Sequence, residues 1–263
     1  MEIQMNDITL HYEETGNGIP IVMIHGFPLN RKIWQPQLQN LTDSARMLAV
    51  DLRGFGESPS TSGPSTMDLY AKDIAEMLDR LDIIAPVLVG LSMGGYVALS
   101  FYRRYARWLS GLILVSTRAS ADSKETKESR DRMVNIVKEP EGIKSITNIM
   151  LPKMLSPKSY IEKPELVSLV KEIMETSSVD GISGALMGMK DRSDSTEILT
   201  GFNIPTLIIH GSDDQLVPLA EAESMAKAIP NSKFQVIPNA GHLPNMEQPD
   251  QFNNIMSTFL KDL

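Results

Sequence analysis

The chain contains no cysteine and has no excess of basic residues. Among its 263 residues there is no thiol, which excludes disulfides, cysteine-ligated zinc, iron–sulfur clusters and a thiol nucleophile. The formal net charge is −8, and the scattered lysines and arginines argue against a nucleic-acid partner. Residues 1–7 lack the basic stretch and apolar run of a secretory signal. We therefore predict a cytoplasmic protein that binds no polyanion.

A long uncharged stretch, residues 83–102, is the one segment with the length of a membrane span. It is interrupted by Pro86, Ser92 and three glycines. Such residues divide the stretch into a short strand, a tight turn and a buried helix. The sequence therefore predicts a globular protein with no membrane partner.

Short apolar runs alternate with segments of helical spacing over most of the chain. A continuous apolar run of this length is typical of a strand that is covered on both faces. The runs are residues 20–24, 46–50, 87–89, 112–115, 206–209 and 234–237, and the predicted helices are 66–81, 94–105, 219–229 and 249–260. Residues 3–14 alternate in polarity and predict two short antiparallel strands. This order favours the α/β class, with a doubly wound, mostly parallel sheet.

Residues 119–200 depart from that alternation. Methionine, lysine, glutamate and serine dominate here at helical spacing, and buried-strand runs are missing. The apolar positions predict four helices, around residues 133–137, 143–150, 166–174 and 182–189, with Pro152, Pro157 and Pro164 at the joints. We expect a helical insertion, 119–200, in a core formed by residues 1–118 and 201–263.

The pentapeptide Gly90-Leu91-Ser92-Met93-Gly94 fits the pattern G-x-S-x-G between a predicted strand and a predicted helix. A serine becomes a useful nucleophile when a sharp turn presents its hydroxyl to a base, and flanking glycines permit such a turn. The alternative is that Ser92 only caps the helix. The strand–turn–helix context favours Ser92 as the nucleophile.

The general base is expected among four histidines. His11 is predicted on an exposed strand face, and His25 and His210 end strands, where backbone hydrogen bonds can account for them. His242 follows the last strand, at the sheet edge where catalytic groups of open α/β folds converge. We therefore predict His242 as the base.

An acid and two hydrogen-bond donors complete the predicted site. Asp213 and Asp214 both follow the strand that ends at His210, and spacing alone does not separate the catalytic acid from a turn-forming neighbour. The developing oxyanion requires preorganised donors. We expect the backbone N–H groups of Met93 and Phe27 in this role, since Pro28 has none.

Together, these motifs resemble the α/β-hydrolase superfamily, and within it the branch of small esterases, cofactor-free haloperoxidases (perhydrolases) and enol-lactonases. The matching segments are His25-Gly26-Phe27-Pro28, residues 51–58, residues 90–95, Gly211…Asp214…Pro218, and Gly241-His242 with Glu247 and Pro249. The order Ser92, Asp214, His242 is that of the superfamily. The resemblance implies an α/β-hydrolase fold, Asp214 as the acid, and a cap domain at 119–200.

The resemblance implies a serine-dependent carboxylic ester hydrolase that forms an acyl-enzyme and needs neither cofactor nor metal. Methionines of the cap suggest an apolar, adaptable pocket for small acyl or aryl esters, namely Met150, Met154, Met174, Met187 and Met189. A lactonase, a C–C bond hydrolase or a perhydrolase would use the same triad. Outside the enzymes, the alternative is a ligand-sensing signalling protein. The expected partner is a small-molecule ester, and a homo-oligomer is compatible with the sequence.

Overall fold

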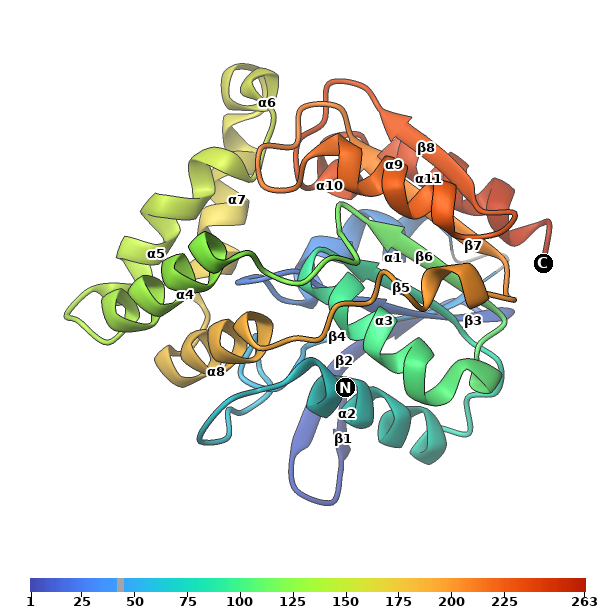
Figure 1. Ribbon diagram of the computed structural model, residues 1–263, viewed down its shortest axis with the longest axis horizontal. Helices are drawn as coiled ribbons and strands as arrows, with labels where there is room; N and C mark the ends of the chain where they lie inside the picture. Colours follow the sequence, from blue (N-terminus) through green and yellow to red (C-terminus); the bar gives the residue numbers. More distant parts are fainter. Residues whose placement is uncertain (42–44) are drawn as a thin grey trace.

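The computed structural model describes residues 1–41 and 45–263. Within these residues, eight strands form one sheet in the order β1-β2-β4-β3-β5-β6-β7-β8, with helices on both faces (Figure 1). β1 pairs with β2 and β2 with β4 in antiparallel fashion, and every pairing from β4 to β8 is parallel. The predicted α/β class and the mostly parallel sheet are confirmed.

Each predicted strand is present. Their bounds are β1 (Glu2–Gln4), β2 (Thr9–Thr15), β3 (Ile19–Ile24), β4 (Ala45–Val50), β5 (Val87–Leu91), β6 (Gly111–Val115), β7 (Thr206–Gly211) and β8 (Lys233–Ile237). β5, β6 and β7 are buried along their whole length, as their continuous apolar character predicts. β8 lies at the edge and is largely exposed.

The helices of the core cover the two faces of the sheet. They are α1 (Gln35–Asn40), α2 (Met67–Arg80), α3 (Met93–Tyr105), α9 (Leu219–Ala228), α10 (Pro244–Glu247) and α11 (Pro249–Leu260). α2, α3 and α9 share one hydrophobic cluster with alternate strand residues, and α1, α10 and α11 share the other. The sheet is therefore doubly wound, as predicted. The short helices α1 and α10 were not predicted.

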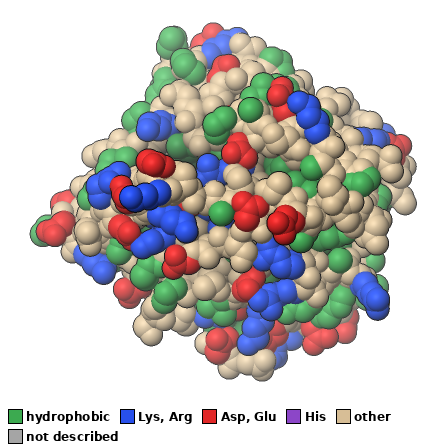
Figure 2. Space-filling model, viewed as in Figure 1, with side chains coloured by type: hydrophobic (Ala, Val, Ile, Leu, Met, Phe, Trp, Pro, Cys, Tyr) green, Lys and Arg blue, Asp and Glu red, His purple; other side chains and the backbone are tan. Residues whose placement is uncertain are grey.

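The uncharged stretch 83–102 contributes β5 and most of α3, which Ser92 separates. No helix among the described residues has the length and apolarity that crossing a bilayer requires. Acidic and basic side chains are interspersed over the face of the molecule seen in Figure 2, a mixture typical of a solvated surface.

Residues 119–200, which we call the helical insertion, lie between β6 and β7, and their α-helices gather on one side of the molecule (Figure 1). Its α-helices are α4 (Lys124–Val137), α5 (Gly142–Met150), α6 (Pro157–Glu162), α7 (Pro164–Glu175) and α8 (Val179–Lys190). The prediction of four helices was wrong, because α6 is a fifth. Six residues carry too few apolar positions to show a helical period, although Pro157 and Pro164 begin α6 and α7 at the predicted joints.

Candidate active site

Ser92 occupies a strained turn between β5 and α3. Its backbone has φ 54° and ψ −112°, a region that costs a non-glycine residue free energy and is concentrated at functional sites. Neighbouring segments of the same chain hold the turn. The Ser92 N–H donates to Val115 O at 2.8 Å, and Thr117 Oγ1 donates to Ser92 O at 2.8 Å. The strain is thus maintained by β6 and the loop that follows it.

The two glycines of the pentapeptide are required by close packing. A Cβ on Gly90 would lie 2.3 Å from Gly94 O, and a Cβ on Gly94 would lie 2.4 Å from Ile24 O. Both separations are far below van der Waals contact. The G-x-S-x-G pattern therefore reflects a turn that packs directly on the end of β3.

His242 and Asp214 form a buried hydrogen-bonded pair. The His242 Nδ1–H donates to Asp214 Oδ2 at 2.8 Å, and both side chains are almost completely buried. The other oxygen, Oδ1, accepts from the N–H groups of Leu216 and Val217. Burial raises the pKa of Asp214, but the charge of His242 and these hydrogen bonds outweigh it, and the pKa lies below its ordinary value.

Asp213, the alternative acid, has a different role in the structure. Its Oδ1 accepts a hydrogen bond from Ser212 Oγ at 3.0 Å, within the turn after β7. Asp214 and not Asp213 therefore bonds to His242, and Asp214 as the acid stays a prediction.

His25 and His210 lie at strand ends with backbone hydrogen bonds, as the sequence predicted, whereas His11 on β2 is less exposed than expected. The His25 Nδ1–H donates to Gly26 O at 2.8 Å, and its Nε2 accepts from the Leu52 N–H at 3.1 Å. The His210 Nε2–H donates to Val217 O at 3.0 Å. Burial lowers the pKa of both rings. His11 is only partly exposed, with Glu2 and Glu57 3.9 Å away.

The loop after β3 lies against the nucleophile turn. A Cβ on Gly26 would contact Leu91 at 2.8 Å and the Ser92 Cβ at 3.2 Å. Within the described residues, neither the Phe27 N–H nor the Met93 N–H donates a hydrogen bond to the protein. Met93 begins α3, where the helix dipole adds partial positive charge. The two expected donors are therefore near Ser92 and unpaired.

Ser92, His242 and Phe27 line one cavity of about 210 Å³. Its walls also contain Tyr96, Arg118, Thr126, Ser129, Arg130, Met133, Met150, Met189, Leu216 and Val217. Of the five methionines expected here, Met150 and Met189 line the cavity. Met154 and Met174 are buried in the hydrophobic cluster that α1, α10 and α11 share, and Met187 is not among the lining residues. Sequence reasoning missed Arg118 and Arg130, which belong to no recognisable motif.

The described residues include no cluster of three or more histidine, aspartate or glutamate side chains arranged to hold a metal ion. The predicted absence of metal and cofactor stays a prediction. The chemistry that the cavity offers comes from a hydroxyl, an imidazole–carboxylate pair and backbone donors.

Known proteins share this architecture. A thermophilic esterase from Thermogutta terrifontis, solved with malate bound, is 40% identical, with a TM-score of 0.96 over 100% of this chain and 98% of its own. The non-heme chloroperoxidase CPO-A1 of Kitasatospora aureofaciens is 29% identical over 96% of both chains. The 3-oxoadipate enol-lactonase 1 of Acinetobacter baylyi is 28% identical over 94% of this chain and 90% of its own. The family model "Alpha/beta hydrolase family" matches residues 21–255. The resemblance is confirmed, and the chain belongs to the alpha/beta hydrolase family.

Proposed function

We propose that the protein is a serine-dependent carboxylic ester hydrolase whose triad is Ser92, His242 and Asp214. The observation that carries the proposal is one cavity lined by both Ser92 and His242, with the 2.8 Å bond from His242 to Asp214 behind it. Names of relatives support the same class, since an esterase and an enol-lactonase both hydrolyse an ester bond.

In this mechanism Ser92 Oγ attacks the ester carbonyl carbon while His242 Nε2 removes the hydroxyl proton. Asp214 fixes the tautomer, because it accepts the Nδ1–H and leaves Nε2 free to act as the base. The N–H groups of Phe27 and Met93 stabilise the oxyanion. His242 then protonates the leaving alkoxide, and water hydrolyses the acyl-enzyme by the same steps in the second half-reaction.

We propose further that the helical insertion is a cap on a core of residues 1–118 and 201–263. The cavity supports this division, because Ser92 and His242 come from the core while Met133, Met150 and Met189 come from α4, α5 and α8. Flexible thioether side chains adapt to varied apolar groups. Small acyl or aryl esters fit a wall of this kind.

The same triad could instead catalyse lactone hydrolysis, C–C bond hydrolysis or peroxide-dependent acyl transfer. A panel of acyl esters, aryl esters and lactones separates an esterase from a lactonase, and addition of hydrogen peroxide tests for perhydrolysis. The predictions of a cytoplasmic location, of no nucleic-acid partner and of compatibility with a homo-oligomer stay predictions.

Hydrolysis of 4-nitrophenyl acetate by the protein and its Ser92→Ala variant tests the proposal. Loss of the nucleophile should lower kcat by about 10⁴–10⁶-fold. Near-identical slow rates for the two proteins would contradict the enzyme and favour the ligand-sensing alternative. Circular dichroism of the variant controls for folding.

A further inference from the structure

Three arginines surround one buried carboxylate beside the catalytic cavity. Arg118 lies in the loop after β6, Arg130 on α4, and Arg192 just after α8. The Asp122 carboxylate accepts from Arg118 Nη2 at 2.7 Å, from Arg192 Nη1 at 2.5 Å, and from the guanidinium of Arg130. Asp122 is fully buried, and the three arginine side chains are between 4% and 17% exposed.

The cluster carries an excess of positive charge. Burial raises the pKa of Asp122, but the hydrogen bond from Arg130 and the charges of Arg130 and Arg192 outweigh it, so the carboxyl stays ionised. One negatively charged carboxylate thus faces three positively charged guanidinium groups, although the net charge of the whole chain is −8. Largely buried charges without partners are costly.

Two further carboxylates lie near the cluster, and the charge of Glu221 acts on Arg118 and that of Arg192 on Asp194 without direct contact. Glu221 accepts from Ser120 Oγ, and Asp194 accepts from the N–H groups of Ala121 and Thr196. Within the described residues, neither forms an ion pair with Arg118, Arg130 or Arg192. A negative group from outside the chain would complete the balance.

Arg192 has little capacity left for a ligand. Besides Asp122 it donates to Met189 O and Ser120 O, and its guanidinium carbon lies 4.0 Å from the centre of the Tyr96 ring. We regard it as the anchor of the cluster.

Arg118 and Arg130 line the catalytic cavity and keep unused donors. Among the described residues, Arg118 makes a hydrogen bond only through Nη2, and its buried Nε has no partner. The Nη1 of Arg130 has only the Met189 sulfur, at 3.4 Å, which is a weak acceptor. The Tyr96 side chain, on the same cavity wall, forms no hydrogen bond in the described residues. Arg118, Arg130 and Tyr96 thus line the same cavity as Ser92.

We propose that Arg118 and Arg130 bind a free carboxylate of the substrate, so that the ester attacked by Ser92 is an anionic one. The guanidinium fork matches a carboxylate with two parallel hydrogen bonds. Because Arg118 belongs to the core and Arg130 to the helical insertion, the same carboxylate connects these two parts. This inference rests on the proposed ester hydrolysis.

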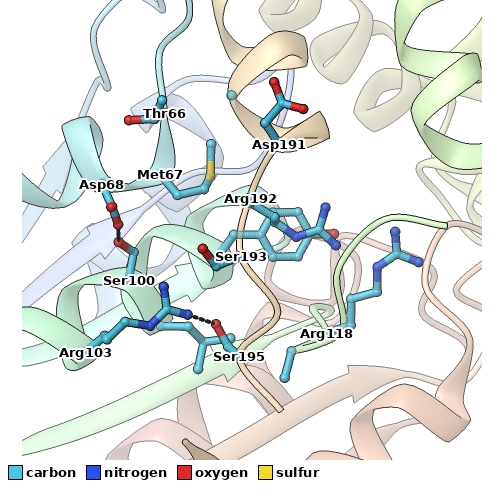
Figure 3. Close-up of a pocket in the computed structure, with 14 residues that line it drawn as sticks. Thr66, Met67, Asp68, Ser100, Arg103, Arg118, Asp191, Arg192, Ser193 and Ser195 are labelled. Atoms are coloured by element: carbon cyan, nitrogen blue, oxygen red, sulfur yellow. Dashed lines mark hydrogen bonds between the residues drawn. The ribbon is translucent and has the colours of Figure 1, made fainter. Parts of the chain in front are cut away.

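A neighbouring pocket of about 150 Å³ shares Tyr96 and Arg118 with the catalytic cavity. Figure 3 shows Arg118 and Arg192 at this pocket, with Arg103 bonded to Ser195 and Asp68 bonded to Ser100. Asp68 and Asp191 are acidic residues on its wall. The wall of this pocket therefore contains acidic residues beside its arginines, whereas the wall of the catalytic cavity, as far as the described residues form it, contains none. We accordingly place the carboxylate site in the catalytic cavity.

Two matched pairs of esters test the inference. Monomethyl glutarate and its amide, methyl 4-carbamoylbutanoate, place the charge on the acyl side. The acetyl esters of 4-hydroxybenzoate and 4-hydroxybenzamide place it on the leaving-group side. In at least one pair, kcat/KM should favour the acid by about ten- to a hundredfold, as charge-assisted hydrogen bonds allow.

Arg130→Gln should abolish that preference, so that the ratio of kcat/KM for the acid to kcat/KM for its amide falls to about one. Arg132→Gln is the matched control, because Arg132 is an exposed arginine of the same helix. Glutarate binding, measured by calorimetry, should weaken about tenfold or more in Arg130→Gln and be unchanged in Arg132→Gln.

The inference is overturned if the wild-type protein prefers neither acid, or if Arg130→Gln and Arg132→Gln behave alike. Failure of the proposed function gives a different result. All four esters would then be as inert with wild-type protein as with Ser92→Ala, and glutarate calorimetry would still decide whether Arg130 binds a carboxylate.

Discussion

Asp214 differs from Asp213 in the number and direction of its hydrogen bonds. Its side chain accepts from one imidazole N–H and two backbone N–H groups, whereas the Asp213 carboxylate has a hydroxyl donor at the turn surface. An asparagine at position 214 would present a donor or a weaker acceptor to His242 and favour the wrong tautomer.

We therefore expect Asp214→Asn to lower kcat by about 10⁴-fold on any ester that the protein hydrolyses. Asp213→Asn is the matched control and should retain activity within a few fold. Steady-state kinetics of both variants make the comparison. Equal losses in the two variants would contradict the assignment of Asp214 as the acid.

Single residues could be proposed from the sequence where a local pattern surrounds them. Ser92 is flanked by Gly90 and Gly94, and His242 and Asp214 each follow a strand at the same edge of the sheet. The arginines of the cavity have no such pattern. Arg118 and Arg130 come together because both donate to Asp122, and no periodicity in the sequence predicts that contact.

At the scale of elements, a buried carboxylate joins the loop that carries His242 to the helical insertion. Glu247 Oε1 accepts from the Gly241 N–H at 2.6 Å, and Oε2 accepts from the Ser156 N–H and the Ser159 hydroxyl, both at 2.7 Å. The His242 N–H donates to Met154 O at 3.1 Å. The start of α6 and the His242 loop are thus held as one unit.

Glu247→Gln should lower the free energy of unfolding by about 1–3 kcal/mol or more, because an amide NH₂ would face one of these three donors. It should also lower kcat, since the His242 loop loses a support. Thermal denaturation and kinetics measure the two effects. Glu162→Gln, an exposed change at the other end of α6, is the control, and an equal result for both would refute the role of Glu247.

Elements were predictable when they were long and apolar. The helix predicted over residues 249–260 has those bounds in the structure, and Thr66 caps α2 through a bond from the Leu69 N–H. The short helices α1, α6 and α10 have four to six residues. Their positions depend on tertiary packing, for which propensity over so few residues is a weak guide.

For the whole molecule, the sheet brings together residues that lie 150 positions apart. Ser92 follows β5, Asp214 follows β7 and His242 follows β8, so all three meet at the carboxyl edge of the parallel strands. This gathering explains why the order of motifs predicted the fold better than it predicted the substrate. Part of the cavity wall comes from the helical insertion, whose sequence showed only helical spacing, namely Thr126, Ser129, Arg130, Met133, Met150 and Met189.

The same compact core makes stability depend on pH. His25 and His210 are fully buried, and burial lowers the pKa of both in the folded protein. In the unfolded chain a histidine has a pKa of about 6.5. As the pH falls below that value, the unfolded chain takes up protons that the folded protein does not bind, so the stability present above about pH 6.5 is progressively lost.

Chemical denaturation at pH 7.5 and at pH 5.5 should therefore show a fall in the free energy of unfolding, by up to about 1.4 kcal/mol for each buried histidine. In His210→Gln the difference in the free energy of unfolding between the two pH values should be smaller, because one buried histidine is gone. In His11→Gln, which changes a partly exposed ring on β2, that difference should equal that of the parent. The comparison isolates the histidine, because Asp73, whose pKa burial raises, titrates alike in all three proteins. If His210→Gln kept the same difference between the two pH values as the parent, the buried ring would not be the source, and protonation elsewhere in the core would have to account for the acid sensitivity.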